Sequence, residues 1–203
     1  AVVGSRNMTG AAALSAVGAL RSGVGLLNIS SERPVLDALK AKLDEPIYTD
    51  IEAVDGVTSK ASALLIGCGI GRSKLTDEKV YSLISSYKGQ IILDADGINA
   101  VSENINVLKK TAKPPILTPH PLEFARLTGM TVDEVCADRI GSARRFAEKS
   151  GCVVVLKGAA TVVTDGNFVY VNDTGNSGLS KGGSGDVLAG VIASLAAQGA
   201  SAL

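Results

Sequence analysis

The chain has 203 residues, 46% of them hydrophobic and only 3% aromatic, and its formal net charge is zero. This length and a core of Val, Ile, Leu and Ala fit one α/β domain. No run of Lys and Arg is longer than two residues and the few aromatic side chains are scattered. The composition therefore excludes a basic nucleic-acid surface and a platform on which bases stack.

Cysteine and histidine usage limits the redox and metal chemistry. Cys68, Cys136 and Cys152 lie far apart without C-x-x-C spacing, which is typical of reduced thiols and predicts a cytoplasmic protein. A single histidine, His120, excludes a metal site built from several histidines. No apolar run approaches the ~20 residues of a membrane-spanning helix, so no membrane association is expected.

Helix-like and strand-like segments alternate along the chain. Apolar residues at helical spacing predict helices at 10–22, 35–43, 76–87, 131–149 and 187–198. Short apolar runs predict strands at 24–29, 62–66, 90–93, 115–117, 152–156, 161–164 and 168–172. The last two runs flank Asp165-Gly166, a hairpin turn signal. Residues 44–60 carry the least pattern, and we expect a long loop or a flap there.

This alternation predicts an α/β fold of three layers, with a mostly parallel central sheet flanked by helices. Ala1–Gly4 resemble the end of a buried strand, and 201–203 directly follow the last predicted helix. We therefore expect residues 1–203 to form a single domain that is truncated at both ends.

Unusual residues follow four of the predicted strands. These are Gly67-Cys-Gly-Ile-Gly71, Asp94-Ala-Asp96, Thr118-Pro-His120 and Lys157-Gly158. In parallel sheets, ligands bind at the carboxyl ends of the strands. We expect the four segments to meet on one rim of the sheet.

Two of these segments leave structural and functional alternatives open. The spacing of Gly67, Gly69 and Gly71 matches neither the dinucleotide fingerprint nor a P-loop. These glycines either let a ligand approach the backbone closely or form a tight turn. Asp94 and Asp96, followed by Asn99, could hold a metal or a polar substrate; alternatively, Asp96 caps a helix.

The other two segments contain the only histidine and a strand-end lysine. His120 lies between two prolines that fix its backbone, and it either hydrogen-bonds a substrate or is structural. Lys157 ends a buried strand, where a charge is costly unless it meets an anion. Phosphate is its natural partner, and Thr161 could add a hydroxyl; alternatively, Lys157 reaches solvent.

The most informative segment is a glycine- and serine-rich run from Asn172 that leads into Asp186 and then into an apolar helix. Such a loop offers free backbone N–H groups at the positive end of a helix dipole, which is a site for phosphate. A carboxylate there suits a base or a magnesium ligand beside a phosphoryl group. The alternative is a flexible surface loop.

Together these segments resemble the ADP-dependent NAD(P)H-hydrate dehydratases, a branch of the ribokinase-like superfamily. The matching segments, in the family's order, are Gly4-Ser5 with Met8–Ala13, Ile66–Gly71, Leu93–Asp96 with Asn99, Leu117–Phe124 with Arg126-Leu127, Val155–Ala159 with Thr161, and Thr174–Asn176 with Lys181–Gly190. They cover nearly the whole chain. The chain departs from the family at Cys68, where proline is usual, and slightly at Gly97.

The resemblance implies a ribokinase-like fold and a repair enzyme for hydrated nicotinamide nucleotides. Such an enzyme dehydrates (6S)-NADHX or (6S)-NADPHX to NADH or NADPH, uses ADP or ATP, and with ADP releases AMP and phosphate. It also implies Mg²⁺ as cofactor, a homotetramer or larger assembly, and an NAD(P)H-hydrate epimerase that works in sequence. The metal ligands stay unassigned.

The resemblance also implies roles for individual residues. Asp186 would be the catalytic base, and Ala12, Gly71 and His120 would contact the hydrate together with Asp186. The residues expected at the nucleotide are Lys157, Gly158, Ala159, Ala160, Thr161, Gly182, Gly183, Ser184 and Gly185. Two alternatives stay open: an ATP-dependent small-molecule kinase of the same superfamily, and a nucleotide-sensing module without catalysis.

Overall fold

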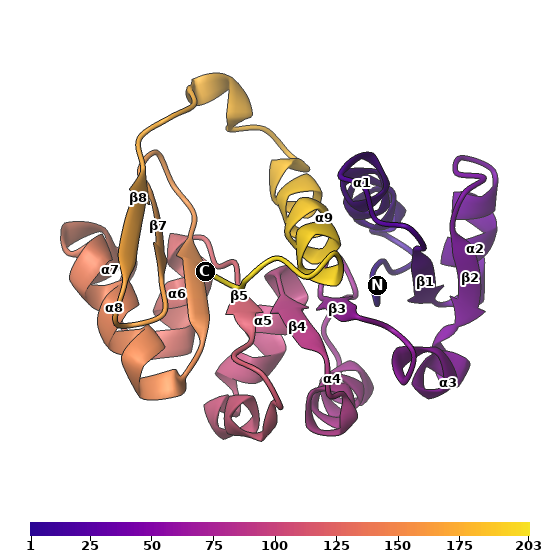
Figure 1. The fold of residues 1–203 in the computed structure, drawn as a ribbon, viewed down its shortest axis with the longest axis horizontal. Coiled ribbons are helices and arrows are strands. Elements are labelled where there is room, and N and C mark those ends of the chain that lie inside the picture. Colours follow the sequence, from indigo (N-terminus) through magenta and orange to yellow (C-terminus); the bar gives the residue numbers. More distant parts are fainter.

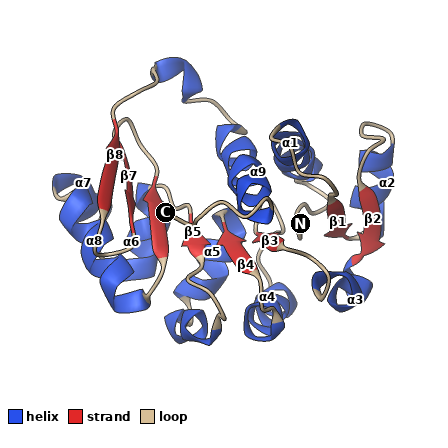
Figure 2. Cartoon of the chain, viewed as in Figure 1, coloured by secondary structure: helices blue, strands red, loops and turns tan.

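The computed structural model describes all 203 residues as an α/β fold (Figures 1 and 2). The helices are α1 (Thr9–Arg21), α2 (Arg33–Lys40), α3 (Val54–Thr58), α4 (Lys74–Ser86), α5 (Ala95–Ser102), α6 (Pro121–Thr128), α7 (Val132–Ala137), α8 (Arg139–Ser150) and α9 (Ser184–Ala197). The strands are β1 (Asn28–Ser31), β2 (Ile47–Asp50), β3 (Ala63–Ile66), β4 (Gln90–Leu93), β5 (Ile116–Leu117), β6 (Val153–Leu156), β7 (Thr161–Thr164) and β8 (Val169–Asn172).

The sheet is mostly parallel, as predicted. Strands β3 to β6 run parallel in chain order, and the hairpin β7–β8 is antiparallel. Strands β1 and β2 form a separate parallel pair. Val2 bridges the two sheets through parallel pairs with Ser30 and Ile66, so the buried N-terminal segment acts as a strand between β1 and β3.

Alternating side chains of the strands divide the interior into two cores. On one face of the sheet, Leu64 and Ile66 pack in a cluster with residues of α4, α5, α6 and α8. On the other face, Leu65 packs with residues of α1, α2 and α9. Figure 1 shows α1 and α9 on the opposite side of the sheet from α4 and α5. The predicted three layers are therefore present, and both faces of the sheet are covered as parallel strands require.

Three predicted boundaries were wrong. The strand expected at 24–29 lies later in the chain, as β1. Residues 44–60, expected as a loop or flap, contain β2 and α3; their pattern is weak because β2 is not fully buried and pairs with β1 alone. The helix expected over 131–149 is interrupted at Asp138, whose carboxylate accepts the N–H of Gly141 at 2.9 Å and begins α8. The capping box of Thr131 and Glu134 is present as predicted and begins α7.

The parallel strands place the four unusual segments on one rim. Gly67, Asp94, Thr118 and Lys157 each directly follow one of the neighbouring strands β3, β4, β5 and β6. No helix in the structure is long and apolar enough to cross a membrane.

Candidate active site

Helix α9 begins with an open N-terminus that faces the rim. Its N-cap, Gly183, has a φ of 90° and therefore lies in the left-handed region that favours glycine. No side chain caps the helix. The backbone N–H groups of Gly182, Gly183, Gly185 and Asp186 find no acceptor within the chain. The open helix start that the glycine-rich sequence predicted is therefore present, and binding of an anion by these donors and the helix dipole stays a prediction.

Asp186 lies in the first turn of α9, and its carboxylate is half-buried. Side-chain atoms of Cys68, Asp94 and Asp186 lie within 4.8 Å of one another. Burial, and then the charge of Asp94, raise the pKa of Asp186 above its usual value, although Cys68 and Lys157 partly oppose them. Asp186 is therefore a stronger base than an exposed aspartate, beside unpaired N–H donors.

A buried ion pair joins two of the strand ends. Lys157 Nζ lies 2.8 Å from Asp94 Oδ1, and the side chain of Asp94 is only 3% exposed. Thr118 Oγ1 also donates to Asp94 Oδ1 at 2.6 Å. Lys157 thus meets an anion, as a charge at this position requires, but the anion within the chain is a carboxylate. A Cβ on Gly185 would lie 3.4 Å from Lys157 Nζ, so the ammonium also reaches the loop that begins α9.

The Gly67–Gly71 loop is tied to the neighbouring strand end. A side chain at Gly67 would collide with the carbonyl oxygen of Asp94, which explains the glycine. Asp96 Oδ2 accepts the N–H of Gly71 at 2.9 Å, so its carboxylate holds this loop and does not cap α5. Cys68 donates to Asp94 Oδ2 at 3.6 Å, and burial, then Asp94, raise the pKa of its thiol. Cys68 is therefore an uncharged neighbour of the two carboxylates.

His120 caps the N-terminus of α6, so it has the structural role that the sequence left open as one of two alternatives. Its Nδ1 accepts the N–H groups of Leu122 and Glu123, and Glu123 in return accepts the N–H of His120 at 2.9 Å. Burial alone would raise the pKa of Glu123, but bonds from His120 and the nearby Lys157 ammonium hold it below its usual value. The ring of His120 is still 46% exposed, so a capping role leaves a surface for a ligand.

A cavity of about 1480 Å³ lies between α9, β6, β7 and the loop that follows β8. Eight predicted site residues line it: His120, Lys157, Gly158, Ala159, Thr161, Gly182, Ser184 and Gly185. Ala160 and Gly183 are not among its lining residues. The sequence reasoning missed the apolar wall formed by Val163, Val187, Leu188 and Val191. The alternation along β7 and the helical spacing of α9 carried that signal.

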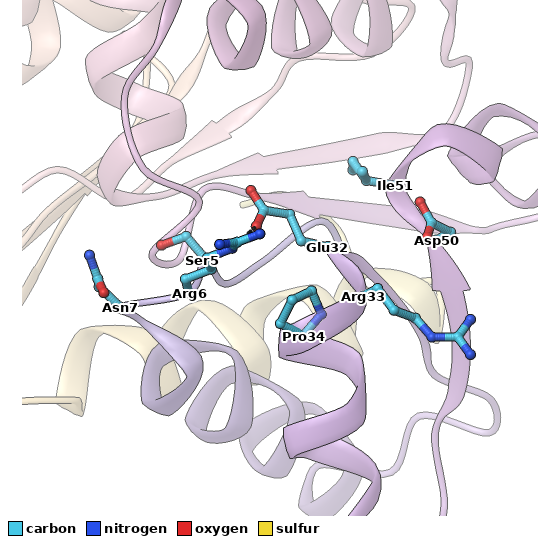
Figure 3. Close-up of a pocket in the computed structure, with 8 residues that line it drawn as sticks. All are labelled: Ser5, Arg6, Asn7, Glu32, Arg33, Pro34, Asp50 and Ile51. Carbon is cyan, nitrogen blue, oxygen red and sulfur yellow. Dashed lines mark ion pairs between the residues drawn. The ribbon is translucent and has the colours of Figure 1, made fainter.

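The prediction that Ala12 contacts a substrate is not supported. Ala12 is fully buried in α1 beneath Gly4, where its small side chain lets the two backbones approach. Its neighbour Ala13 is only partly buried. Gly71 is also partly exposed, close to Ser5. Ser5 in turn lines a second cavity, of about 580 Å³ (Figure 3).

Comparison with known proteins identifies what the chain resembles. The family model described as NAD(P)H-hydrate dehydratase matches residues 1–203. The chain is 38% identical over 214 residues to the bifunctional NAD(P)H-hydrate repair enzyme Nnr of Moorella thermoacetica, covering 98% of this chain but only 40% of that protein.

Solved structures give the same result for the fold. An ADP/ATP-dependent NAD(P)H-hydrate dehydratase from Bacillus subtilis, co-crystallised with ATP/Mg²⁺, matches with a TM-score of 0.83 and 33% identity, covering 97% of this chain and 72% of that one. A ribokinase-like superfamily protein from Enterococcus faecalis matches with a TM-score of 0.86 and 26% identity, covering 96% and 69%. The expected ribokinase-like fold is thereby confirmed.

Proposed function

We propose that this chain, which belongs to the NAD(P)H-hydrate dehydratase family, dehydrates hydrated NADH and NADPH back to the reduced nucleotides with ADP as co-substrate. The observation that carries the proposal is Asp186 in the first turn of a helix with four unpaired backbone N–H groups at its start, where Gly182 and Gly185 line a cavity of about 1480 Å³. A base for a hydroxyl and donors for a phosphoryl group are what phosphoryl transfer needs.

Hydroxide is a poor leaving group, and a phosphate ester solves this problem. Asp186 accepts the proton of the hydrate's hydroxyl as its oxygen attacks the β-phosphorus of ADP. The new O–P bond forms while the bond from that phosphorus to AMP breaks. The phosphate then leaves with the C–O bonding pair, the ring loses a proton from the neighbouring carbon, and the double bond of the reduced nicotinamide is restored.

The N-terminus of α9 stabilises the transferring group. The N–H groups of Gly182, Gly183, Gly185 and Asp186 are already oriented, so they bind the charge on the phosphoryl oxygens without further ordering. Lys157, held between Asp94 and Gly185, contributes a positive charge at the same place. Lys157, Gly158, Ala159 and Thr161 line the cavity and are assigned to the nucleotide, and Ala160 is assigned to it by the family resemblance alone. His120, at the part of this cavity next to Lys157, is assigned to the hydrate together with Gly71 and the exposed side of α1 near Ala13.

Magnesium fits the donor set of this site. Mg²⁺ prefers oxygen ligands and is usually held by one or two carboxylates together with substrate phosphates. The carboxylates of Asp94 and Asp186 lie close enough to serve, whereas the Cys68 thiol is unsuited to this ion. When bound, the ion would neutralise phosphate charge.

The wider setting of the reaction is also proposed. The chain spans about 40% of the bifunctional relative from Moorella. We propose that an NAD(P)H-hydrate epimerase works in sequence with it and, from the family resemblance, that it assembles as a homo-oligomer. We infer that residues 1–203 belong to one domain, and the three free cysteines fit a cytoplasmic location.

The experiment is to incubate the protein with NADH hydrate and follow the absorbance band of reduced nicotinamide. We expect recovery of NADH that requires ADP or ATP and yields phosphate in equal amount. No nucleotide-dependent recovery with either hydrate would contradict the proposal. Phosphorylation of an alcohol by ATP, without recovery of NADH, would favour a small-molecule kinase.

A further inference from the structure

The second cavity lies on the same rim as Asp186 but on the side away from the nucleotide cavity. Figure 3 shows its lining: Ser5, Arg6 and Asn7 from the segment before α1, Glu32 and Arg33 at the start of α2, and Asp50 at the end of β2. Ser5 follows the N-terminal strand, two strand positions from the end of β4. With ~4.8 Å between strands, Ser5 lies roughly 10 Å along the rim from Asp94.

The proposed reaction needs room for two nucleotides, and this inference rests on that reaction. ADP occupies the cavity beside Lys157, so the part of the hydrate beyond its nicotinamide ring must extend from Asp186 in the opposite direction. That direction passes Gly71, where a Cβ would lie 3.8 Å from Ser5 Oγ, and ends at the second cavity. The start of α2, where Arg33 lies, is three strand positions from β4, or roughly 14 Å. The adenosine end of a dinucleotide would lie there.

The second cavity presents hydrogen-bond donors to such a group. The backbone N–H groups of Arg6 and Asn7 have no acceptor within the chain, and the Ser5 hydroxyl has no partner. The Arg6 guanidinium is 3.6 Å from Glu32, and both side chains are more than half exposed. Exposed ion pairs of this kind are weak, whereas an arginine fork binds a phosphate dianion in a charge-assisted, bidentate way.

We propose that the second cavity binds the adenosine ribose of the hydrate, and that Arg6 contacts the 2′-phosphate of NADPHX. Glu32 has the complementary role, because a carboxylate accepts hydrogen bonds from the 2′-hydroxyl of NADHX and repels a 2′-phosphate. The Arg6–Glu32 pair therefore determines which of the two hydrates is preferred.

Replacing Arg6 or Glu32 by Gln shifts the preference between NADPHX and NADHX in opposite directions. Arg6→Gln lowers kcat/KM for NADPHX by about tenfold and leaves NADHX within about twofold, since one charge-assisted contact is lost. Glu32→Gln raises the ratio of NADPHX to NADHX turnover by about threefold. Glu32 makes no side-chain bond to α2, so this variant leaves the helix intact.

Arg21→Gln is the matched control. Arg21 pairs with Glu45 at 3.5 Å and is 73% exposed, compared with 3.6 Å and 77% for Arg6, but it lies at the far end of α1. This variant keeps the wild-type ratio. If Arg6→Gln and Glu32→Gln also kept it while the wild type turned over both hydrates, the inference would be wrong and the proposed function would stand.

Calorimetry with NADP⁺ and NAD⁺ makes the test independent of turnover. Arg6→Gln weakens binding of NADP⁺ about tenfold and leaves NAD⁺ unchanged, and the NADP⁺ effect shrinks as salt rises. If Arg6→Gln weakened the binding of NADP⁺ and NAD⁺ equally, Arg6 would support the segment before α1 and would not contact the 2′-phosphate. A wild type that turns over neither hydrate would contradict the proposed function instead.

Discussion

Helices α6 and α9 both begin at the rim, yet their N-termini differ completely. In α6, His120 and Glu123 form a reciprocal capping box, and Pro121 removes one donor, so the first turn is satisfied from within. In α9, the cap is a left-handed glycine, no side chain caps the helix, and four N–H groups point to no acceptor. The donors at the start of α6 are satisfied within the chain, whereas those at the start of α9 are free for an anion.

The difference separates a structural motif from a binding motif. The donors of α9 are partly open to solvent and its carboxylate has a raised pKa, so this terminus is available to a ligand, whereas that of α6 is not. Two ion pairs on the rim differ in a similar way. Lys157 and Asp94 are paired at 2.8 Å and mostly buried, whereas Arg6 and Glu32 are exposed at 3.6 Å and can exchange partners. The following predictions test this comparison.

Replacing the base should have the largest effect. Asp186→Asn is expected to lower turnover by about 10²- to 10⁴-fold, because a general base contributes that much. Binding of ADP, measured by calorimetry, should survive because the N–H groups of the loop remain. Equal loss of binding and turnover would show that Asp186 maintains the site, through its structure or the bound metal, and does not act as the base.

The same variant should increase stability at neutral pH. The pKa of Asp186 is raised in the folded state, so the folded protein binds more protons than the unfolded chain between the ordinary and raised values. The free energy of unfolding therefore falls as pH rises through that window. Asp186→Asn cannot ionise, so the variant does not lose this stability. Urea unfolding at pH 7 should show a higher unfolding free energy, and a lower one would contradict this account of the charge.

Two glycine substitutions should separate anion binding at the start of α9 from the general cost of a side chain at a left-handed helix cap. Gly183→Ala places a side chain at a φ of 90° against Leu14, so we expect loss of anion binding and roughly tenfold slower turnover, with about 1 kcal/mol of strain. Gly129→Ala is the control, because Gly129 has a φ of 73° at the end of α6 with no neighbour within 4 Å. It should cost similar stability, measured by thermal unfolding, and no activity.

At His120, two variants distinguish capping from substrate contact. Asn is a good N-cap, so His120→Asn should keep stability, whereas His120→Ala should lose about 1 kcal/mol. If the exposed ring contacts the hydrate, both variants should raise KM for the hydrate several-fold. Wild-type kinetics for His120→Asn in a steady-state assay would limit His120 to its capping role.

The smallest effect should appear in the pH profile. The acid limb of kcat/KM should lie above the ordinary aspartate pKa, and activity should fall as pH drops because Asp186 must be ionised to accept a proton. Lys157→Gln removes a charge that lowers the pKa of Asp186, so the limb should move to higher pH. An unchanged limb would assign it to another group.

The sequence by itself determined the layers, the common rim of the strand ends and the open glycine-rich start of α9. Those features depend on short-range patterns: apolar runs give buried strands, and glycine before an apolar helix gives free N–H groups. The hairpin at Asp165-Gly166 and the capping box at Thr131 were predictable for the same reason.

Only the tertiary structure decided which polar groups meet. Lys157 pairs with Asp94, 63 residues away, and Asp96 holds Gly71, because parallel strands bring distant strand ends together. The weakly patterned 44–60 segment forms β2 and α3 because backbone pairing with β1 needs no particular side chains. Ala12 is buried because Gly4 allows α1 to approach closely, and no single segment of sequence carries that contact.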